Sequence, residues 1–398
     1  MSTPSSLPLD NVRIVDLSQV QFGPCATQVL GDFGAEIIKI ERPGEGDICR
    51  STDPFIVEPD GESAYFMGLN RNKRGVALNM GSEAGKRVVM QLLDKADVLV
   101  HNFRPGVAER LGLGFEELHR SHPRLIYASG SGFGPTGPLA HKGGQDFLAQ
   151  SLSGLASRNP DANGVPQLFP TALGDFTSGM VLAQGILMAL YQRERTGLGQ
   201  KVEVSLLDVL LTLQQQEVTQ WLLRKKEVNW VQQNLIGIFP TKDGAVTLVG
   251  VFRPNPLADI CKALELEDYS AWPQYADRAS WGPNRAAIFE LLAPAFAKYT
   301  TAECLSRLDG QDVLCAPVLS LDEALNQEQV KVNGMRIEFE HPVHGTVRTV
   351  GNPLHLSSVP QIALRAAPTL GQHNDEVLAE LGYADTDIQR LRQDGVVG

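Results

Sequence analysis

One long stretch without charge constrains the fold of this chain more than any other feature. It runs from Ala172 to Tyr191, and no charged side chain lies between Asp175 and Arg193. A helix that is apolar on all sides is normally buried. The longest apolar runs are interrupted by polar residues such as Gln184, and none approaches the roughly 20 residues of a membrane span. The stretch therefore predicts a helix in the core of the protein.

The acidic residue at the start of this stretch has two interpretations. Asp175, Thr177 or Ser178 could cap the helix by accepting hydrogen bonds from its first free N–H groups. Alternatively, Asp175 is a carboxylate nucleophile that the positive end of the helix keeps ionised by lowering its pKa. The stretch by itself leaves both interpretations open.

Strands and helices alternate through residues 1–210. We expect strands at 12–17, 36–40, 75–79, 98–100, 125–129 and 201–206, and helices at 24–33, 82–96, 146–155, after Asp175 and at 208–223. Repeated strand–helix–strand order predicts a parallel sheet with helices on both faces. The expected fold class is therefore α/β, with a large Rossmann-like domain.

The pattern changes after Leu223. Residues 224–227 form a charged linker, and 239–251 predict a hairpin with Asp243 and Gly244 in its turn. The sequence therefore predicts a large domain beginning with 1–223, linkers and a smaller α+β domain at 224–333, and a separate segment at 334–398.

Composition narrows the classes of partner. The chain has 398 residues and a net charge of −11, which argues against nucleic acid and anionic membranes. Its five cysteines and eight histidines show no metal spacing, so we expect no metal site. Free thiols, and an N-terminus without the features of a signal peptide, favour the cytoplasm.

Polar residues gather where the strands of the predicted sheet end, the edge at which such sheets bind ligands. Several of them are cations that could hold phosphates, although any single one is more often a solvated surface charge. No G-x-G-x-x-G follows the first strand, so a dinucleotide site is not indicated. The residues assigned to ligand binding are Val20, Arg42, Asn102, Phe103, Arg104 and Arg110, which follow strands, and Asn70, Lys73 and Arg74, which precede the third strand.

Seven segments, in order, resemble the class III CoA-transferases. They are VQFGPCATQVLGDFGAEIIKIERP, LNRNKRGVALNM, ADVLVHNFRPGVAERLG, IYASGSGFGPTGP, ALGDFTSGM, ERTGLGQKVEVSLLD and LGQHNDEVLAELGY. The resemblance implies a Rossmann-like domain that residues 334–398 complete. It also implies an interlocked homodimer, with the active site where the large domain of one copy meets the small domain of the other.

The resemblance also assigns roles to residues. Asp175 matches the catalytic aspartate, and Gln21 matches a glutamine beside the thioester. Asp146 either orients the reacting groups or caps the helix that follows it. Four residues match positions that hold coenzyme A, and three more lie in segments that reach it: Arg42, Asn102, Phe103 and Arg110, then Lys73, Arg74 and Lys142.

The implied activity is transfer of coenzyme A from an acyl-CoA to a free carboxylic acid. Asp175 would form a mixed anhydride with the acyl group and then a thioester with CoA, while Gln21 binds the oxyanion. CoA and acyl-CoA are then substrates, and no tightly bound cofactor is expected. The sequence does not identify the two acids.

Three alternatives remain at this stage. A 2-methylacyl-CoA racemase of the same fold needs a second base, but the matching position holds Gln145, which cannot act as one. A CoA-binding protein without turnover would form no covalent intermediate. A thiol-based acyltransferase would use Cys25, at a helix start where its pKa could be lowered. In the small domain, Val249–Pro254 matches a Gly-rich flap, and Arg253 could pair with a second substrate carboxylate.

Overall fold

The computed structural model describes residues 7–53, 63–232, 235–359 and 364–398. The chain divides into two compact units. The first combines Met1–Gln214 with Gly334–Gly398, and the second is Gln215–Asn333.

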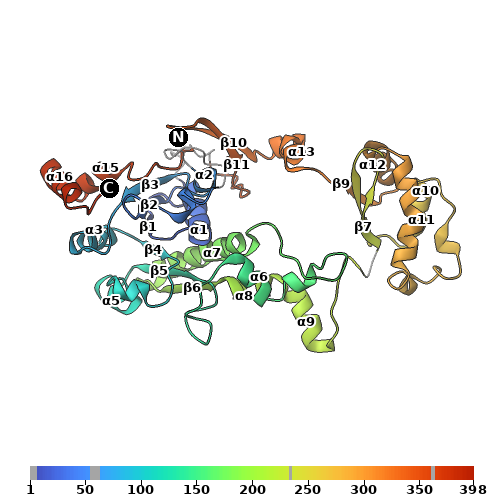
Figure 1. The fold of residues 1–398 in the computed structure, drawn as a ribbon, viewed down its shortest axis with the longest axis horizontal. Coiled ribbons are helices and arrows are strands. Elements are labelled where there is room, and N and C mark those ends of the chain that lie inside the picture. The colour runs from blue at the N-terminus through green and yellow to red at the C-terminus, as the bar shows by residue number, and fades with distance from the viewer. Residues whose placement is uncertain (1–6, 54–62, 233–234, 360–363) are drawn as a thin grey trace. The chain divides into compact units, whose positions relative to one another are not determined.

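A six-stranded sheet forms the centre of the first unit, in the order β3-β2-β1-β4-β5-β6 (Figure 1). Every neighbouring pair is parallel, which confirms the predicted α/β class. The order changes direction between β1 and β4, and a crevice at the carboxyl ends of the strands is expected there. The strands are β1 (Arg13–Asp16), β2 (Glu36–Glu41), β3 (Lys73–Ala77), β4 (Val98–His101), β5 (Ile126–Ser131) and β6 (Lys201–Ser205).

Alternate residues of these strands bury opposite faces of the sheet, as the two-residue period requires. Ile14 packs into one apolar cluster with residues of α1 (Phe22–Asp32) and α7 (Leu173–Thr196). Val15 packs into the other, with residues of helices on the opposite face. Those helices are α3 (Glu83–Leu93), α4 (Val107–Arg110), α5 (Phe115–Ser121), α15 (Asn374–Glu380) and α16 (Asp385–Gln393).

The long uncharged stretch forms α7, which packs on α1, β5 and β6. Gly179 permits the contact with α1, because a Cβ there would lie 2.7 Å from Cys25 Cβ. The prediction of a helix is confirmed, but burial on all sides is wrong: Phe176, Met188 and Tyr191 are 49%, 69% and 62% exposed. Among the described helices, α7 is also the one that fits a membrane span by length and composition, a test that core helices pass too.

Two boundaries differ from the prediction. The third strand begins at Lys73 rather than Gly75. The helix expected over 208–223 is broken at Gln214, whose side-chain amide donates to Ser153 O and Leu210 O. Its two parts are α8 (Leu206–Leu213) and α9 (Gln215–Arg224), and the second belongs to the second unit. Two short helices, α2 (Ala64–Leu69) and α6 (Asp146–Leu152), complete this part of the first unit.

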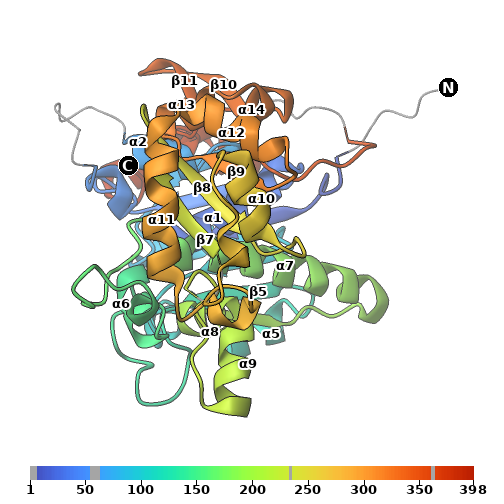
Figure 2. The same ribbon diagram turned by 90° about the vertical axis from the view of Figure 1, so that its right-hand side faces the viewer.

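The second unit is α+β, as predicted. Its antiparallel sheet has the order β7-β8-β9, and β7 and β8 form the expected hairpin with Pro240 opposite Ala245. Figure 2 shows α11 alongside this sheet. The elements are β7 (Leu235–Pro240), β8 (Ala245–Gly250), α10 (Pro256–Ala263), α11 (Arg285–Lys298), α12 (Thr301–Asp309), β9 (Leu314–Pro317), α13 (Leu321–Asn326) and α14 (Glu328–Val332).

The last segment of the chain packs against the six-stranded sheet. After the antiparallel pair β10 (Arg336–His341) and β11 (Gly345–Val350), Arg365 exchanges hydrogen bonds with Asn72. Asn374 Oδ1 accepts from Ala77 N at 2.8 Å, and Gly398 N donates to Ala77 O. These bonds use backbone groups that β3 leaves free at the edge of the sheet.

Candidate active site

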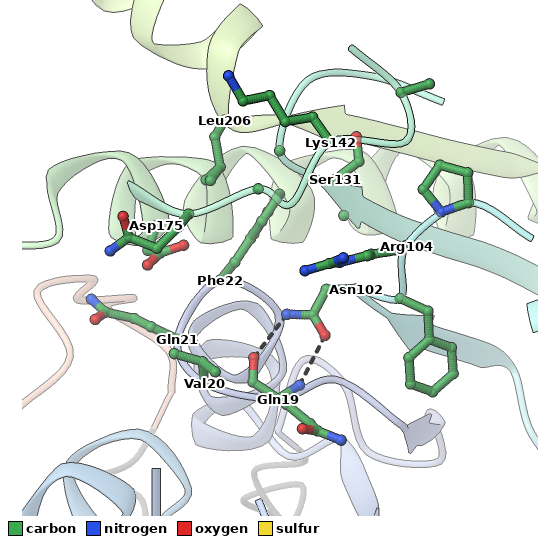
Figure 3. Close-up of a pocket in the computed structure, with 17 residues that line it drawn as sticks. Gln19, Val20, Gln21, Phe22, Asn102, Arg104, Ser131, Lys142, Asp175 and Leu206 are labelled. Carbon is green, nitrogen blue, oxygen red and sulfur yellow. Dashed lines mark hydrogen bonds between the residues drawn. The ribbon is translucent and has the colours of Figure 1, made fainter. Parts of the chain in front are cut away.

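A cavity of about 300 Å³ lies at the carboxyl ends of β1, β4 and β5, where the strand order changes direction (Figure 3). Seven of the predicted residues line it: Val20, Gln21, Asn102, Phe103, Arg104, Lys142 and Asp175. The other lining residues are Gln19, Phe22, Pro105, Gly130, Ser131, Gly132, Ala140, Gly144, Gln145 and Leu206.

Asp175 reaches the cavity from the first turn of α7. The helix begins after Ala172 and has no side-chain cap, so the prediction that Asp175, Thr177 or Ser178 caps it is wrong. A residue from another helix satisfies one N–H group of the first turn instead: Asp146 Oδ2 accepts from Asp175 N at 2.8 Å. Gly174 permits the approach, because a Cβ there would lie 2.9 Å from that oxygen.

The carboxyl group of Asp175 holds its proton more tightly than an ordinary aspartate. Burial, and then repulsion from the Asp146 carboxylate, raise its pKa from 3.8 to about 7. The expectation that the helix N-terminus lowers this pKa is therefore wrong. Near neutral pH both forms of Asp175 are present.

The opposite wall of the cavity is the N-terminus of α1. Gln21 precedes the helix without capping it, so its amide is available to the cavity. Its Oε1 accepts from the hydroxyl of Tyr65 at 3.2 Å. Figure 3 shows the Gln21 and Asp175 side chains on facing walls. This arrangement leaves an amide donor opposite a carboxylate.

The turn between β1 and α1 is held in an unusual conformation. Val20 has φ of 66°, a left-handed value that a β-branched residue strongly disfavours. Asn102 accepts from Gln19 N at 2.9 Å and donates to Gln19 O at 2.8 Å, joining this turn to the loop after β4. Asn102 thus supports the cavity wall as well as lining it.

Two of the predicted cations face the cavity. Arg104 and Lys142 come from different loops, and both line the cavity. Arg42 and Arg110 are not lining residues, and Arg42 is exposed and paired with Glu45 at 2.8 Å. The cavity therefore offers two positive charges to an anionic ligand.

Asn70, Lys73 and Arg74 lie elsewhere, which differs from the expectation that they contact the ligand. Lys73 is buried with its ammonium 3.1 Å from Asp16 and 2.9 Å from Asn70 Oδ1. Arg74 pairs with Glu36 and Glu380. Both residues start β3, with Lys73 level with Ile37, and neither side chain lines the cavity.

Two further predictions concerned reactive or mobile groups. Burial raises the pKa of the Cys25 thiol to about 12, which makes it a poor nucleophile. In the second unit, Arg253 pairs with Asp259 at 3.0 Å and with Asp312 at 2.6 Å. The Val251 and Arg253 carbonyl groups accept from Arg278. These bonds tie the segment expected to be a flap to its own unit.

Sequence reasoning did not assign Gln19, Phe22, Leu206 or Tyr65 to the site. Gln19 and Phe22 flank assigned residues on the same turn, so their position after the first strand was a usable signal. Tyr65 and Leu206 are brought to the site by tertiary packing, and no local pattern marks them.

Comparisons with known proteins agree with the predicted resemblance. A family model described as CoA-transferase family III matches residues 9–374. The mouse succinyl-CoA:glutarate CoA-transferase is 35% identical, over 99% of this chain and 91% of its own length. The formyl-CoA:oxalate CoA-transferase of Escherichia coli O157:H7 is 34% identical, over 98% of this chain and all of its own. A CAIB/BAIF family protein of Brucella suis superposes with a TM-score of 0.85 at 28% identity, covering 94% of this chain and 100% of that one.

Proposed function

The chain belongs to CoA-transferase family III, and from that premise we propose that it moves coenzyme A between an acyl-CoA and a free carboxylic acid with Asp175 as nucleophile. The observation that carries the proposal is the position of Asp175: a partly buried carboxylate at a helix start, facing the Gln21 amide across a cavity edged by Arg104 and Lys142.

The proposed reaction keeps the thioester energy in covalent form. The Asp175 carboxylate attacks the acyl-CoA carbonyl, the C–S bond breaks, and CoA leaves as thiolate. The thiolate then attacks the aspartyl carbonyl, which gives an aspartyl–CoA thioester and the free donor acid. The acceptor acid reverses both steps. The Gln21 amide is proposed to donate to the oxyanion that forms in each addition.

The cations of the cavity fit the charge of the substrate. Arg104 and Lys142 are proposed to bind the phosphates of CoA, because guanidinium and ammonium groups form strong charge-assisted hydrogen bonds with phosphate oxygens. The chain itself supplies the nucleophile, so no tightly bound cofactor is required.

We propose that the chain acts in the cytoplasm as an interlocked homodimer, as the family resemblance implies. The exposed apolar face of α7 supports this, since a second copy covering Phe176, Met188 and Tyr191 would remove their side chains from water.

The racemase alternative finds no support in the cavity. Proton removal and return at an α-carbon needs two groups that can exchange a proton. Of the residues described as lining the cavity, Asp175 is the one carboxylate, and Gln145 replaces the base that a racemase requires. Deuterium incorporation at the α-carbon without an added acid would restore the alternative.

The covalent route has a direct test. The protein is incubated with a panel of acyl-CoAs, including succinyl-CoA and formyl-CoA, and the intermediate is trapped with hydroxylamine. We expect a hydroxamate on Asp175, detected by mass spectrometry of its peptide, and the acyl-CoAs that produce it identify the donor. Tight CoA binding with neither label nor transfer would instead indicate a binding protein without turnover.

Transfer should depend on pH through Asp175. Because the ionised form attacks and its pKa is about 7, kcat/KM should fall about tenfold per pH unit well below pH 7. Asp146→Asn removes the repelling charge but keeps an acceptor for Asp175 N. The fall of kcat/KM on the acidic side of the pH profile, its acid limb, should therefore move to lower pH. Asp385→Asn, an exposed control, should leave it in place. An acid limb that Asp146→Asn does not move would contradict this origin of the pKa.

A further inference from the structure

The left-handed turn at Val20 requires a restraint, because a valine is rarely stable at φ of 66° without one. The turn stands between β1 and Gln21, and it sets where the Gln21 amide and the first N–H groups of α1 point. A relaxed Val20 would redirect both. The structure therefore has to contain groups that hold the turn.

A buried ion pair beneath the turn supplies part of this restraint. Lys39 and Asp47 are 2.9 Å apart, and both side chains are 0% exposed. Asp47 Oδ1 accepts from Val20 N at 3.0 Å, and Lys39 Nζ donates to Ser18 O at 2.8 Å. One ion pair thus binds the backbone on both sides of Gln19.

The pair is itself fixed to the end of β2. Asp47 N donates to Glu41 Oε2 at 2.9 Å, and Asp47 Oδ1 also accepts from Cys49 N at 3.1 Å. Neither Lys39 nor Asp47 lines the cavity. Buried ion pairs contribute little stability compared with well-packed apolar residues. The pair instead fixes the positions of two backbone groups of the turn, Val20 N and Ser18 O.

We propose that Lys39 and Asp47 form a positioning pair for the reaction, holding the Val20 turn so that Gln21 faces Asp175. The inference rests on the proposed function, since it concerns the rate at which Asp175 forms its adduct. Neither residue touches the substrate. Their effect is on the geometry of the groups that do, and misplacement by about 1 Å can reduce a rate about 100-fold.

The main test removes both charges together. In Lys39→Met/Asp47→Leu the neighbouring carboxylates keep cations of their own, Lys73 for Asp16 and Arg50 for Glu41. Single-turnover formation of the Asp175 adduct should slow by about 10- to 100-fold, with CoA affinity changed by about threefold or less. A folded variant that forms the adduct at the wild-type rate would overturn the proposal. If the wild-type protein forms no adduct at all, it is the proposed function that fails.

A matched control removes another ion pair from the same unit. Arg193 and Asp97, 2.8 Å apart, join the end of α7 to the start of β4 and are absent from the cavity lining. Arg193→Met/Asp97→Leu should leave the adduct rate per folded molecule within about twofold of wild type. An equal loss in both double variants would show a general effect of lost ion pairs and overturn the specific role.

Single substitutions at Asp47 test the bond to Val20 and cover the case in which the double variant does not fold. Asp47→Asn retains a side-chain oxygen for Val20 N, whereas Asp47→Ala does not. The adduct rate per folded molecule should therefore be at least about fivefold higher in Asp47→Asn. Equal rates in the two variants would overturn the proposal.

Discussion

Replacing Asp175 with asparagine should abolish transfer and stabilise the protein at the same time. Asparagine has nearly the same shape, but its amide cannot form the proposed mixed anhydride. Loss of a covalent nucleophile typically costs about 1,000-fold or more in kcat. Transfer and hydroxylamine labelling should both disappear, and CoA binding should persist because the cations of the cavity are unchanged.

The gain in stability follows from the raised pKa of Asp175. An acid whose pKa rises on folding binds its proton more tightly in the native state, so native stability falls as pH rises from about 4 through 7. The shift from 3.8 to about 7 corresponds to about 4 kcal/mol above pH 7, at 1.36 kcal/mol per pKa unit, and partial solvation makes about 2–4 kcal/mol the expected range. Asparagine carries no charge to bury.

Denaturant unfolding at two pH values measures this effect. At pH 8 the Asp175→Asn variant should unfold at a higher denaturant concentration than wild type. The difference in stability between the two proteins should shrink as the pH approaches 4. The Asp175 carboxyl group of the native wild-type protein is then protonated, so neither protein buries a charge at this position. Asp385→Asn is the control, since its exposed side chain should change neither curve. A variant less stable than wild type at pH 8 would contradict the assignment of a buried, repelled carboxylate.

The sheet was predictable because its signals are local. Short apolar runs such as those around Val15 and Val98, each separated from the next by a helical pattern, define parallel strands without tertiary information. The hairpin at Asp243 and Gly244 followed from turn chemistry in the same way. Residues directly after β1 and β4, among them Gln21 and Asn102, were placed at the cavity for that reason.

The predictions that were wrong concern properties that depend on contacts between residues far apart in the sequence. The pKa of Asp175 depends on its burial and on Asp146, which approaches from α6, and neither is encoded near Asp175 in the chain. The assignment of Lys73 depended on where β3 begins. β3 begins two residues earlier than predicted, so Lys73 lies within the strand, and its ammonium pairs with the buried Asp16 of β1 instead of facing a ligand.

The same substitution should therefore have different effects at the two lysines: at Lys73 it should lower stability, and at Lys142 it should raise the KM for acyl-CoA. Asp16 is fully buried, and Lys73 and Lys39 together hold its pKa at about 2 although burial alone would raise it. Lys73→Met removes one of these two cations. Removing one partner of a buried ion pair costs about 3–5 kcal/mol, so this variant should be strongly destabilised. Its remaining folded molecules should bind acyl-CoA with an ordinary KM, because the ammonium faces Asp16 and Asn70 rather than the cavity.

Lys142→Met removes the same charge from an exposed position on the cavity wall. Its stability should stay within about 0.5 kcal/mol of wild type, as for most surface substitutions. The KM for acyl-CoA should rise about tenfold, since a hydrogen bond to a charged group contributes about 1.5–3 kcal/mol. Denaturant unfolding and steady-state kinetics on both variants separate the two roles. A stable Lys73→Met enzyme with a raised KM would return Lys73 to the CoA site and contradict its place in the buried ion pair.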